Sequence, residues 1–367
     1  MEEEMEEVLI RLEKERKQSE KNYSVPEISG YTAAQEEFTG GRFLVTSFYM
    51  PEIKDEVQRR ERIFKLYHIL SAHTEKMCIR DRLAAYAGQN SPYYGRLYKG
   101  LPEDWKLTDL PTVNKVDLMA HFDMWLTDRT VTEEAVNSFM EDRENIGRLM
   151  DGKYLIFTTS GSTGSPLVVL YDKTCMNISS ALSVLRAYAR REDLSAFIKK
   201  GKRTASIFAE GFYLGSGSVK YQLRRMPWKK GMMMNLDVRT PTAEIVEKLN
   251  RFSPVMLGGY PSGLELLADE QAAGRLHISP AIVMTGGELL RDEVREKLAD
   301  AFGGYVQTNY SCTEGGTMCH ECVNRHLHIN DEWIMIEAVD EDNRPVPDGT
   351  QSAKILLTNL ANKAARW

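Results

Sequence analysis

The stretch Thr158-Thr159-Ser160-Gly161-Ser162-Thr163-Gly164-Ser165-Pro166 joins two short runs of apolar residues, 154–157 and 167–171. Both runs are rich in β-branched or aromatic residues, which predicts two strands with the polar stretch as the loop between them. Glycines allow a ligand to approach the backbone closely, and hydroxyl and N–H groups are the donors that a phosphate needs. The stretch therefore predicts a phosphate-binding loop, with a polar hairpin turn as the alternative. A Walker A loop is excluded because no Lys-Ser/Thr pair opens a following helix.

The composition of the 367-residue chain is that of an ordinary globular protein, with 42% hydrophobic and 27% charged residues. Its net charge of −6 argues against nucleic acid or an anionic membrane as a partner. The sequence contains no apolar run long enough to span a bilayer, and its acidic start does not resemble a signal peptide, so we expect a cytoplasmic protein. The five cysteines are odd in number and unevenly spaced, which disfavours a disulfide framework.

The first 82 residues differ in character from the rest of the chain. They predict a helical segment without recognisable chemistry, and the string Met77-Cys78-Ile79-Arg80-Asp81-Arg82 resembles translated sequencing-adaptor sequence. This resemblance favours a segment joined artificially to the remainder, whereas the alternative is a basic turn between helices. We therefore divide the chain into residues 1–82, a main domain at 83–363 and a truncated end at 364–367.

Strands and helices alternate in the middle of the main domain. Residues 255–257, 282–285 and 305–309 are apolar runs that predict strands, and the segments between them have helical periodicity. This alternation implies parallel strands with right-handed crossovers, and ligands bind beyond the carboxyl ends of such strands. The rule places three segments at one edge of the sheet: residues 258–261, 286–288 and 310–314.

The two connecting helices have recognisable ends and buried faces. Ser262 is the predicted N-cap of the first helix, and Gly303 is the predicted stop of the second. The residues expected to face inward are Leu264, Leu267 and Ala268 in the first helix, and Leu290, Val294, Leu298 and Phe302 in the second. A further helix is predicted at residues 174–190.

Two short motifs follow these strands. Gly286-Gly287-Glu288 alone is typical of a tight turn, and Tyr310-Ser311-Cys312-Thr313-Glu314 alone is typical of a polar loop. In this order after the loop at 158–166, they resemble the adenylate-forming (AMP-binding) superfamily, in particular its phenylacetate–coenzyme A ligase and capsule-biosynthesis adenylyltransferase branch. Supporting motifs are Asn90-Ser91-Pro92-Tyr93-Tyr94, Leu110-Pro111, Gly259-Tyr260-Pro261-Ser262, Leu327-His328-Ile329-Asn330 and Leu357-Thr358-Asn359-Leu360. The resemblance covers residues 83–363.

The resemblance implies an α/β fold, the large N-terminal domain of an adenylate-forming enzyme, with helices around mixed and parallel twisted sheets. It also implies an acid–thiol ligase that uses ATP, Mg²⁺ and coenzyme A. A carboxylic acid would form an acyl-adenylate, and the thiol of coenzyme A would then displace AMP. The alternatives are a nucleotide-binding fragment without catalysis, or an adenylyltransferase with a non-thiol acceptor in polysaccharide biosynthesis. A homodimer is the oligomer we expect.

The resemblance also implies roles for individual residues. Thr163, Thr313 and Glu314 would be catalytic, with Thr313 bound to the α-phosphate and Glu314 to Mg²⁺. Tyr310 would lie against the adenine, and the acyl group would lie near Tyr260. The nucleotide-binding set would be completed by the loop residues Thr159, Ser160, Gly161, Ser162, Thr163 and Gly164 and by the backbone of Gly286, Gly287 and Glu288.

The sequence departs from the superfamily pattern in two places. Leu167 stands where many relatives have a lysine, so charge at the pyrophosphate must come from elsewhere. The chain ends at Trp367, before the ribose-binding Gly-Asp segment and the small C-terminal lid domain with its catalytic lysine. Because one positioned transition-state charge contributes on the order of a hundredfold in rate, we expect the 367-residue chain to have little or no ligase activity. Robust acyl-coenzyme A formation by the purified chain would contradict this expectation.

A Cys-x-x-Cys pair follows the second motif. Cys319 and Cys322, with His328 or a neighbouring histidine, have spacing that suits a structural zinc site. The alternative is a pair of free thiols with histidines at the surface.

Overall fold

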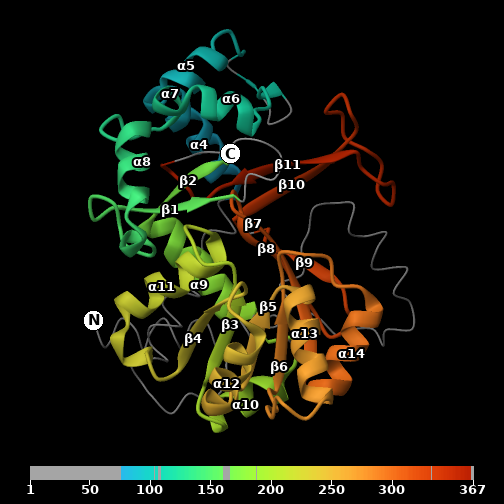
Figure 1. Cartoon of the computed structure of the whole chain (residues 1–367). Coiled ribbons are helices and arrows are strands. Elements are labelled where there is room, and N and C mark those ends of the chain that lie inside the picture. The colour runs from blue at the N-terminus through green and yellow to red at the C-terminus, as the bar shows by residue number, and fades with distance from the viewer. Residues whose placement is uncertain are drawn as a thin grey trace, which may run out of the picture. The chain divides into compact units, whose positions relative to one another are not determined.

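The computed structural model describes residues 76–102, 104–105, 109–159, 166–186, 188–331 and 333–364. Its largest sheet has seven strands in the order β4-β3-β5-β6-β7-β8-β9, and two antiparallel strand pairs, β1–β2 and β10–β11, stand apart from it (Figure 1). The strands are β1 (Tyr154–Thr158), β2 (Val168–Asp172), β3 (Thr204–Phe208), β4 (Met233–Asp237), β5 (Met256–Gly259), β6 (Ile282–Thr285), β7 (Tyr305–Cys312), β8 (Gly316–Glu321), β9 (Leu327–Ile329), β10 (Ile334–Val339) and β11 (Lys354–Asn359).

Helices precede the first strand pair and alternate with the strands of the large sheet. Those before β1 are α4 (Lys76–Asn90), α5 (Pro92–Leu97), α6 (Lys115–Ala120), α7 (Phe122–Trp125), α8 (Glu133–Glu141) and the short 3₁₀ helix η3 (Arg143–Asn145). Those after β2 are α9 (Lys173–Arg186), α10 (Arg191–Lys199), α11 (Leu214–Arg225), the 3₁₀ helix η4 (Pro227–Lys229), α12 (Thr242–Phe252), α13 (Pro261–Ala272) and α14 (Asp292–Phe302). None of the described helices combines the length and apolar character needed to cross a bilayer.

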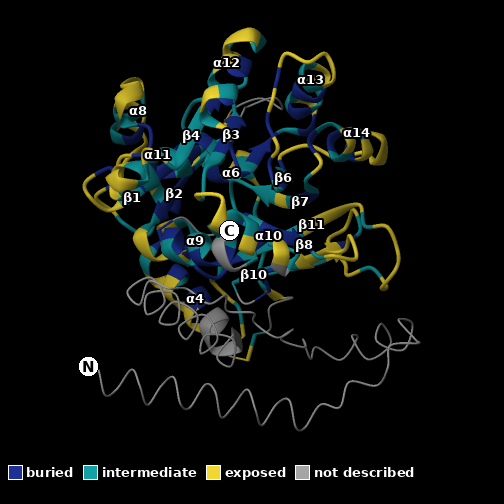
Figure 2. Ribbon diagram, turned by 90° about the horizontal axis from the view of Figure 1, so that it is seen from below, coloured by how far each residue is buried: buried dark blue, intermediate teal, exposed yellow. Residues whose placement is uncertain are grey.

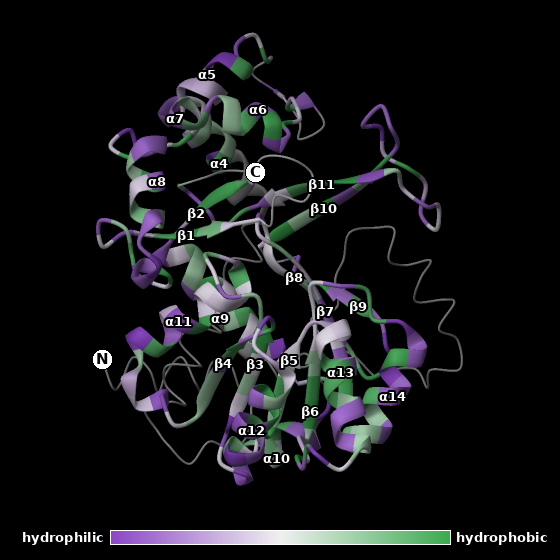
Figure 3. Ribbon diagram, in the orientation of Figure 1, coloured by the Kyte–Doolittle hydropathy of each residue, from purple (hydrophilic) through white to green (hydrophobic). Residues whose placement is uncertain are grey.

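The parallel part of the large sheet confirms the predicted strand–helix alternation. Strands β3, β5, β6 and β7 pair in parallel, for example at Leu257↔Val283 and Val283↔Val306. One apolar core joins these strands to α12, α13 and α14, and Leu264, Leu298 and Phe302 lie in it as predicted. Figure 2 shows the outer surfaces of these helices exposed, and Figure 3 shows apolar residues gathered in strands such as β6. The helices therefore fix the strands whose carboxyl ends carry the predicted motifs.

The opening loop connects two strands, as the sequence predicted. β1 and β2 pair antiparallel, with Leu155 opposite Tyr171, and the rings of Phe157 and Tyr171 meet edge to face with centroids 5.1 Å apart. Both strands are buried at their centres in a second apolar core with α5, α6 and α7. The first helices begin at polar caps, and the side chain of Ser91 accepts a hydrogen bond from the N–H of Tyr94 at 3.3 Å.

Strand β7 is longer than the sequence predicted, because it changes partners. It pairs in parallel with β6 as far as Thr308 and then antiparallel with β8 from Asn309 to Cys312. Tyr310 and Cys312 are therefore strand residues, and the loop predicted at 310–314 is reduced to a turn around Thr313 and Glu314. The pairing skips Met318, so β8 contains a bulge opposite Tyr310 and Ser311.

Two helix ends differ from the sequence predictions. Helix α13 begins at Pro261, with Tyr260 as its N-cap, so the prediction of Ser262 as N-cap is wrong. Proline is favoured at a first helical position because its fixed φ suits the helix and its missing N–H leaves no donor unpaired. Helix α9 ends at Arg186, four residues before the predicted end. Gly303 ends α14 in a left-handed conformation with φ 66°, as predicted.

The predicted division of the chain at residue 82 falls inside a helix. Helix α4 runs from Lys76 to Asn90 through this position, and its residues Leu83, Ala84 and Ala87 are buried. The rest of residues 1–82, up to position 75, lies outside the described residues. The origin of the first 82 residues therefore stays a prediction.

Candidate functional site

The base of the opening loop is fastened at the carboxyl edge of the large sheet. The N–H of Thr158 donates to the carbonyl of Phe212, in the segment after β3, at 2.8 Å. Thr159 closes the loop, because its N–H donates to the carbonyl of Leu167 at 3.0 Å and its hydroxyl accepts from the N–H of Leu167 at 2.9 Å. The remaining loop residues predicted to bind phosphate, Ser160, Gly161, Ser162, Thr163 and Gly164, lie outside the described residues.

The Gly286-Gly287 pair needs glycine for steric reasons. Gly287 has φ +80°, and a Cβ atom on it would lie 2.8 Å from the ring of Tyr260. A Cβ on Gly286 would lie 2.6 Å from Oδ1 of Asn309. Tyr260 in turn meets the ring of Phe208 edge to face at 5.1 Å. Residues at or just beyond the ends of β3, β5, β6 and the parallel part of β7 therefore lie close together, at the carboxyl edge of the sheet that the sequence predicted.

Glu288 joins two neighbouring segments of this edge. One of its carboxylate oxygens accepts from the N–H of Ser262 at 3.1 Å, and the other accepts from the hydroxyl of Ser262 at 3.0 Å. The carboxylate thus caps the first turn of α13, where it also meets the positive end of the helix dipole. The side chain that caps this helix therefore comes from the next strand-to-helix connection, 26 residues away from Ser262.

Replacing Glu288 with alanine should lower the free energy of unfolding by about 1 kcal/mol, the usual contribution of a helix N-cap. Urea unfolding monitored by circular dichroism would measure the change. Glu296→Ala, on α14, is the control because this exposed carboxylate lies beyond the first turn of its helix and caps none of its N–H groups. An equal effect of the two substitutions would contradict the capping role.

The turn that carries Thr313 and Glu314 is held from three sides. The hydroxyl of Tyr171, in β2, donates to the carbonyl of Thr313 at 2.9 Å. The side-chain amide of Asn359, in β11, donates to the carbonyl of Glu314 at 3.0 Å. The N–H of Gly315 donates to Sγ of Cys312 at 3.2 Å. The structure thus links this turn directly to β2, the strand that leaves the opening loop.

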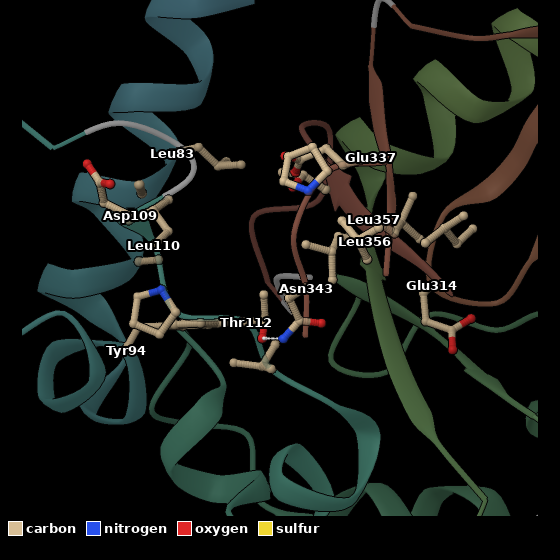
Figure 4. Close-up of a pocket in the computed structure, with 18 of the residues that line it drawn as sticks. Leu83, Tyr94, Asp109, Leu110, Thr112, Glu314, Glu337, Asn343, Leu356 and Leu357 are labelled. Atoms are coloured by element: carbon tan, nitrogen blue, oxygen red, sulfur yellow. Dashed lines mark hydrogen bonds between the residues drawn. The ribbon is translucent and has the colours of Figure 1, made fainter. Parts of the chain in front are cut away.

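A cavity of about 820 Å³ lies beside this turn (Figure 4). Tyr310, Cys312 and Glu314 line it from β7 and the turn, and Tyr310 is 46% exposed. Figure 4 shows Glu314, Leu356 and Leu357 on one side of the cavity and Tyr94 and Leu110 on the other. Further lining residues are Leu83, Tyr98, Val113, Met318, Glu337 and Asn343. The volume is in the range of small-molecule sites.

The predicted nucleotide residues are divided between two places. Tyr310 and Glu314 face the cavity, whereas Gly286, Gly287 and Glu288 do not line it and lie at the sheet edge. Thr313 also does not line the cavity. The two places are joined through β7, which runs from the sheet edge to the turn.

The positive charges beside the loop base are engaged with carboxylates. Lys220, in α11, is ion-paired with Glu210 in the segment after β3. The guanidinium of Arg239 donates to Asp237 at 2.6 Å and to the carbonyl of Glu210 at 2.9 Å, and it lowers the pKa of Asp237 to about 2. Both cations are thus already paired with groups of the protein.

The predicted zinc ligands are not brought together. Cys319 lies opposite Ile329 in the β8–β9 pair and is buried in an apolar cluster, whereas His328 lies opposite His320. Because successive strand residues point to opposite faces, Cys319 and His328 are on different faces of the pair. Burial also raises the pKa of the Cys319 thiol to about 11. Within the described ranges, no three Cys, His, Asp or Glu side chains form a metal-binding group.

His320 is instead a buried structural residue. Its side chain is within hydrogen-bond distance of Asn330, and only 6% of the residue is exposed. The carbonyl of Ile329 and the side chain of Asn330 also accept hydrogen bonds from Arg186. Burial, reinforced by the positive charge of Arg186, lowers the pKa of His320 from 6.5 to about 4.

Acidification should destabilise the protein through His320. The unfolded chain protonates this residue near pH 6.5 and the folded chain only near pH 4, so the stabilising contribution is complete above pH 6.5 and is lost as the pH falls to 4. The loss in unfolding free energy should be about 3 kcal/mol. Urea titrations between pH 7.5 and 4 would measure it. The variant His320→Gln should flatten this part of the profile, and an unchanged slope would contradict the assignment.

Several contacts at the site were missed at the level of sequence. Phe212, Tyr171 and Asn359 each bond to a backbone group of a predicted motif from a distant part of the chain. Only Asn359 lay within a motif that supported the family resemblance. In the sequence, Tyr171 is one aromatic residue of an apolar strand. Nothing in that pattern indicates a hydrogen-bond partner 142 residues away.

Known proteins of similar fold are coenzyme A ligases. A structure of 2-hydroxyisobutyryl-CoA ligase in the postadenylation state, in complex with R3-HIB-AMP, matches 87% of this chain and 65% of its own, with a TM-score of 0.59 and 17% identity. An open conformation of that ligase, in complex with 2-HIB-AMP and CoA, matches 87% of this chain and 72% of its own, with a TM-score of 0.56 and 17% identity. The likeness confirms the predicted α/β fold.

One curated protein is similar in sequence over most of this chain. Protein CapK of Staphylococcus aureus is 20% identical over 299 residues, which are 79% of this chain and 60% of CapK. The chain therefore spans about three fifths of the length of this curated relative. No family model matches the sequence.

Proposed function

We propose that this chain is the ATP-binding part of an acid–thiol ligase that activates a small carboxylic acid and transfers it to coenzyme A. A carboxylate oxygen of the acid would attack the α-phosphorus of ATP while the bond to the β-phosphate breaks and pyrophosphate leaves. The thiol sulfur of coenzyme A would then attack the acyl carbonyl carbon, and AMP would leave. The fold supports this proposal. The similar ligase structures support it as well, because they are complexes with R3-HIB-AMP or with 2-HIB-AMP and CoA.

The observation that carries the proposal is the hydrogen bond between Tyr171 and the carbonyl of Thr313. It connects the strand after the predicted phosphate loop to the turn that bears the predicted α-phosphate and magnesium residues. A second bond, from the N–H of Thr158 to the carbonyl of Phe212, ties the base of the same loop to the segment after β3 and also supports the proposal. The strand that leaves the predicted phosphate loop is thus joined directly to a turn more than a hundred residues further along the chain, which supports a shared role of the loop and the turn.

The residues of the turn fit the proposed cation. Mg²⁺ in phosphoryl-transfer sites is held by one or two carboxylates together with substrate phosphates, and Glu314 offers a partly exposed carboxylate beside the cavity. Bound Mg²⁺ would neutralise phosphate charge. The hydroxyl of Thr313 would donate to an α-phosphate oxygen, and hydroxyl and amide groups of Ser160, Gly161, Ser162, Thr163 and Gly164 would bind the departing pyrophosphate. The ring of Tyr310 would cover the adenine.

Calorimetric titration with ATP, with and without Mg²⁺, tests the proposal without depending on turnover. We expect the 367-residue chain to bind ATP, to bind it more tightly with Mg²⁺, and to prefer ATP over GTP. Binding titrations with a panel of small carboxylic acids, which also need no turnover, would then identify the acid. Absence of ATP binding at millimolar concentrations in the presence of Mg²⁺ would overturn the proposed function.

A further inference from the structure

The structure assigns Tyr171 and Asn359 as positioning residues that fix the Thr313–Glu314 turn and thereby the direction of the Glu314 carboxylate. This inference rests on the proposed function. Neither residue contacts substrate in this assignment, and each acts through a backbone carbonyl of the turn. Together they bond the carbonyls of two consecutive residues, so the turn cannot rotate about either peptide without breaking a part-buried hydrogen bond.

Tyr171 is rigid enough to serve as an anchor. It is fully buried, its ring packs edge to face against Phe157, and its backbone is paired with β1 at Leu155. Burial raises the pKa of its hydroxyl well above the ordinary value, so the group remains a hydrogen-bond donor. Gly316, just after the turn, has φ +71°, and a Cβ on it would lie 3.4 Å from this hydroxyl. The backbone thus passes closely over Tyr171.

Asn359 is fixed by hydrogen bonds at both ends of its side-chain amide. The residue is 1% exposed, and its Oδ1 accepts from the N–H of Ala361 at 3.0 Å and of Asn362 at 3.3 Å. Its Nδ2 therefore faces the carbonyl of Glu314. The amide of Asn362 donates in turn to the carbonyl of Leu170 in β2 at 2.9 Å. The two anchors thus belong to one buried framework that joins β2, the turn and the end of β11.

The position of the Glu314 carboxylate is important because this charged group is the proposed ligand of Mg²⁺. A magnesium ion between a carboxylate and phosphates demands near-ideal octahedral geometry, so a displaced carboxylate loses the ion before it loses the nucleotide. The bonds from Tyr171 and Asn359 should therefore affect the Mg²⁺ dependence of ATP binding and leave metal-free ATP binding almost unchanged. A purely structural role would lower overall stability without this selectivity.

The test compares two variants with controls of the same residue type. Tyr171→Phe and Asn359→Ala each remove a hydrogen bond to the turn. Tyr154→Phe removes the bond from the neighbouring strand to Asp128, and Asn145→Ala removes a part-buried bond to the carbonyl of Phe139, away from the turn. The Mg²⁺ concentration that gives half of the strengthening of ATP binding should rise about fivefold in each test variant and stay within twofold in the controls. ATP binding in EDTA should stay within twofold in all four.

Hydrogen exchange provides a second measurement that needs no nucleotide. Amide exchange in residues 313–316 should become faster in both test variants, while β1 stays protected. Wild-type Mg²⁺ dependence in a folded Tyr171→Phe variant, or unchanged exchange in the turn, would overturn the inference. Failure of the wild-type chain to bind ATP would instead overturn the proposed function, and the exchange data would still decide whether the two residues fix the turn.

Discussion

Replacing Arg295 with methionine is expected to lower the free energy of unfolding by about 3–5 kcal/mol, because it leaves the carboxylate of Glu321 buried without its partner. The guanidinium of Arg295, in α14, donates to both carboxylate oxygens of Glu321, in β8, at 2.6 and 3.0 Å. Arg295 is 8% exposed and also donates to the carbonyl of Val306 at 2.9 Å. Urea unfolding at neutral pH would measure the loss.

Two further variants separate this effect from a general loss of charge. Arg295→Met combined with Glu321→Leu removes both charges and should recover part of the stability, although it leaves the N–H of Thr308 without its bond to Glu321. Arg251→Met, on α12, breaks an exposed ion pair with Glu247 and should change stability little. If Arg295→Met were no more destabilising than Arg251→Met, the buried pair would not hold α14 against β7 and β8.

Replacing Glu314 with glutamine is expected to reduce the strengthening of ATP binding by Mg²⁺ by about 100-fold, the upper range for substitutions in metal-binding sites. The side-chain amide of glutamine is neutral, so its oxygen attracts Mg²⁺ much less strongly than a charged carboxylate does. The substitution is nearly isosteric, and the carbonyl of Glu314 keeps its bond from Asn359, so the turn should stay in place. Titration with ATP at several Mg²⁺ concentrations would measure the effect.

The matched control is Glu296→Gln on α14, which removes one exposed carboxylate that does not line the cavity. It should leave the Mg²⁺ dependence unchanged. Metal-free ATP binding should also remain within about threefold in Glu314→Gln, since the carboxylate is proposed to bind the ion and not the nucleotide. An equal loss of ATP binding with and without Mg²⁺ would contradict the proposed role.

Local patterns predicted much of the central fold. The loop from Thr158 to Pro166 joins two strands, and β5, β6 and β7 with their helices lie where apolar runs and helical periodicity placed them. Gly303 ends α14 because its left-handed conformation is easily adopted only without a side chain. These features depend on neighbouring residues and on burial of one face, and both are visible in sequence.

Features set by distant residues were not predictable in the same way. The cap of α13 comes from Glu288 rather than Ser262, and Tyr310 became a strand residue because β8 folds back to pair with it. The zinc prediction failed because the spacing of Cys319 and His328 says nothing about which face of a strand each occupies. The anchors Tyr171 and Asn359 are similarly invisible until the tertiary structure brings them to the turn.

The bulge at Met318 has a consequence for comparing this chain with its relatives. Because β8 holds one residue more than β7 across the bulge, a relative that lacks this residue would restore regular pairing in the hairpin. An alignment that places the gap in the turn would then equate Thr313 and Glu314 with the wrong positions. In such an alignment the gap belongs at Met318. With the gap at that position, Glu314 is matched to the corresponding turn residue of the relative.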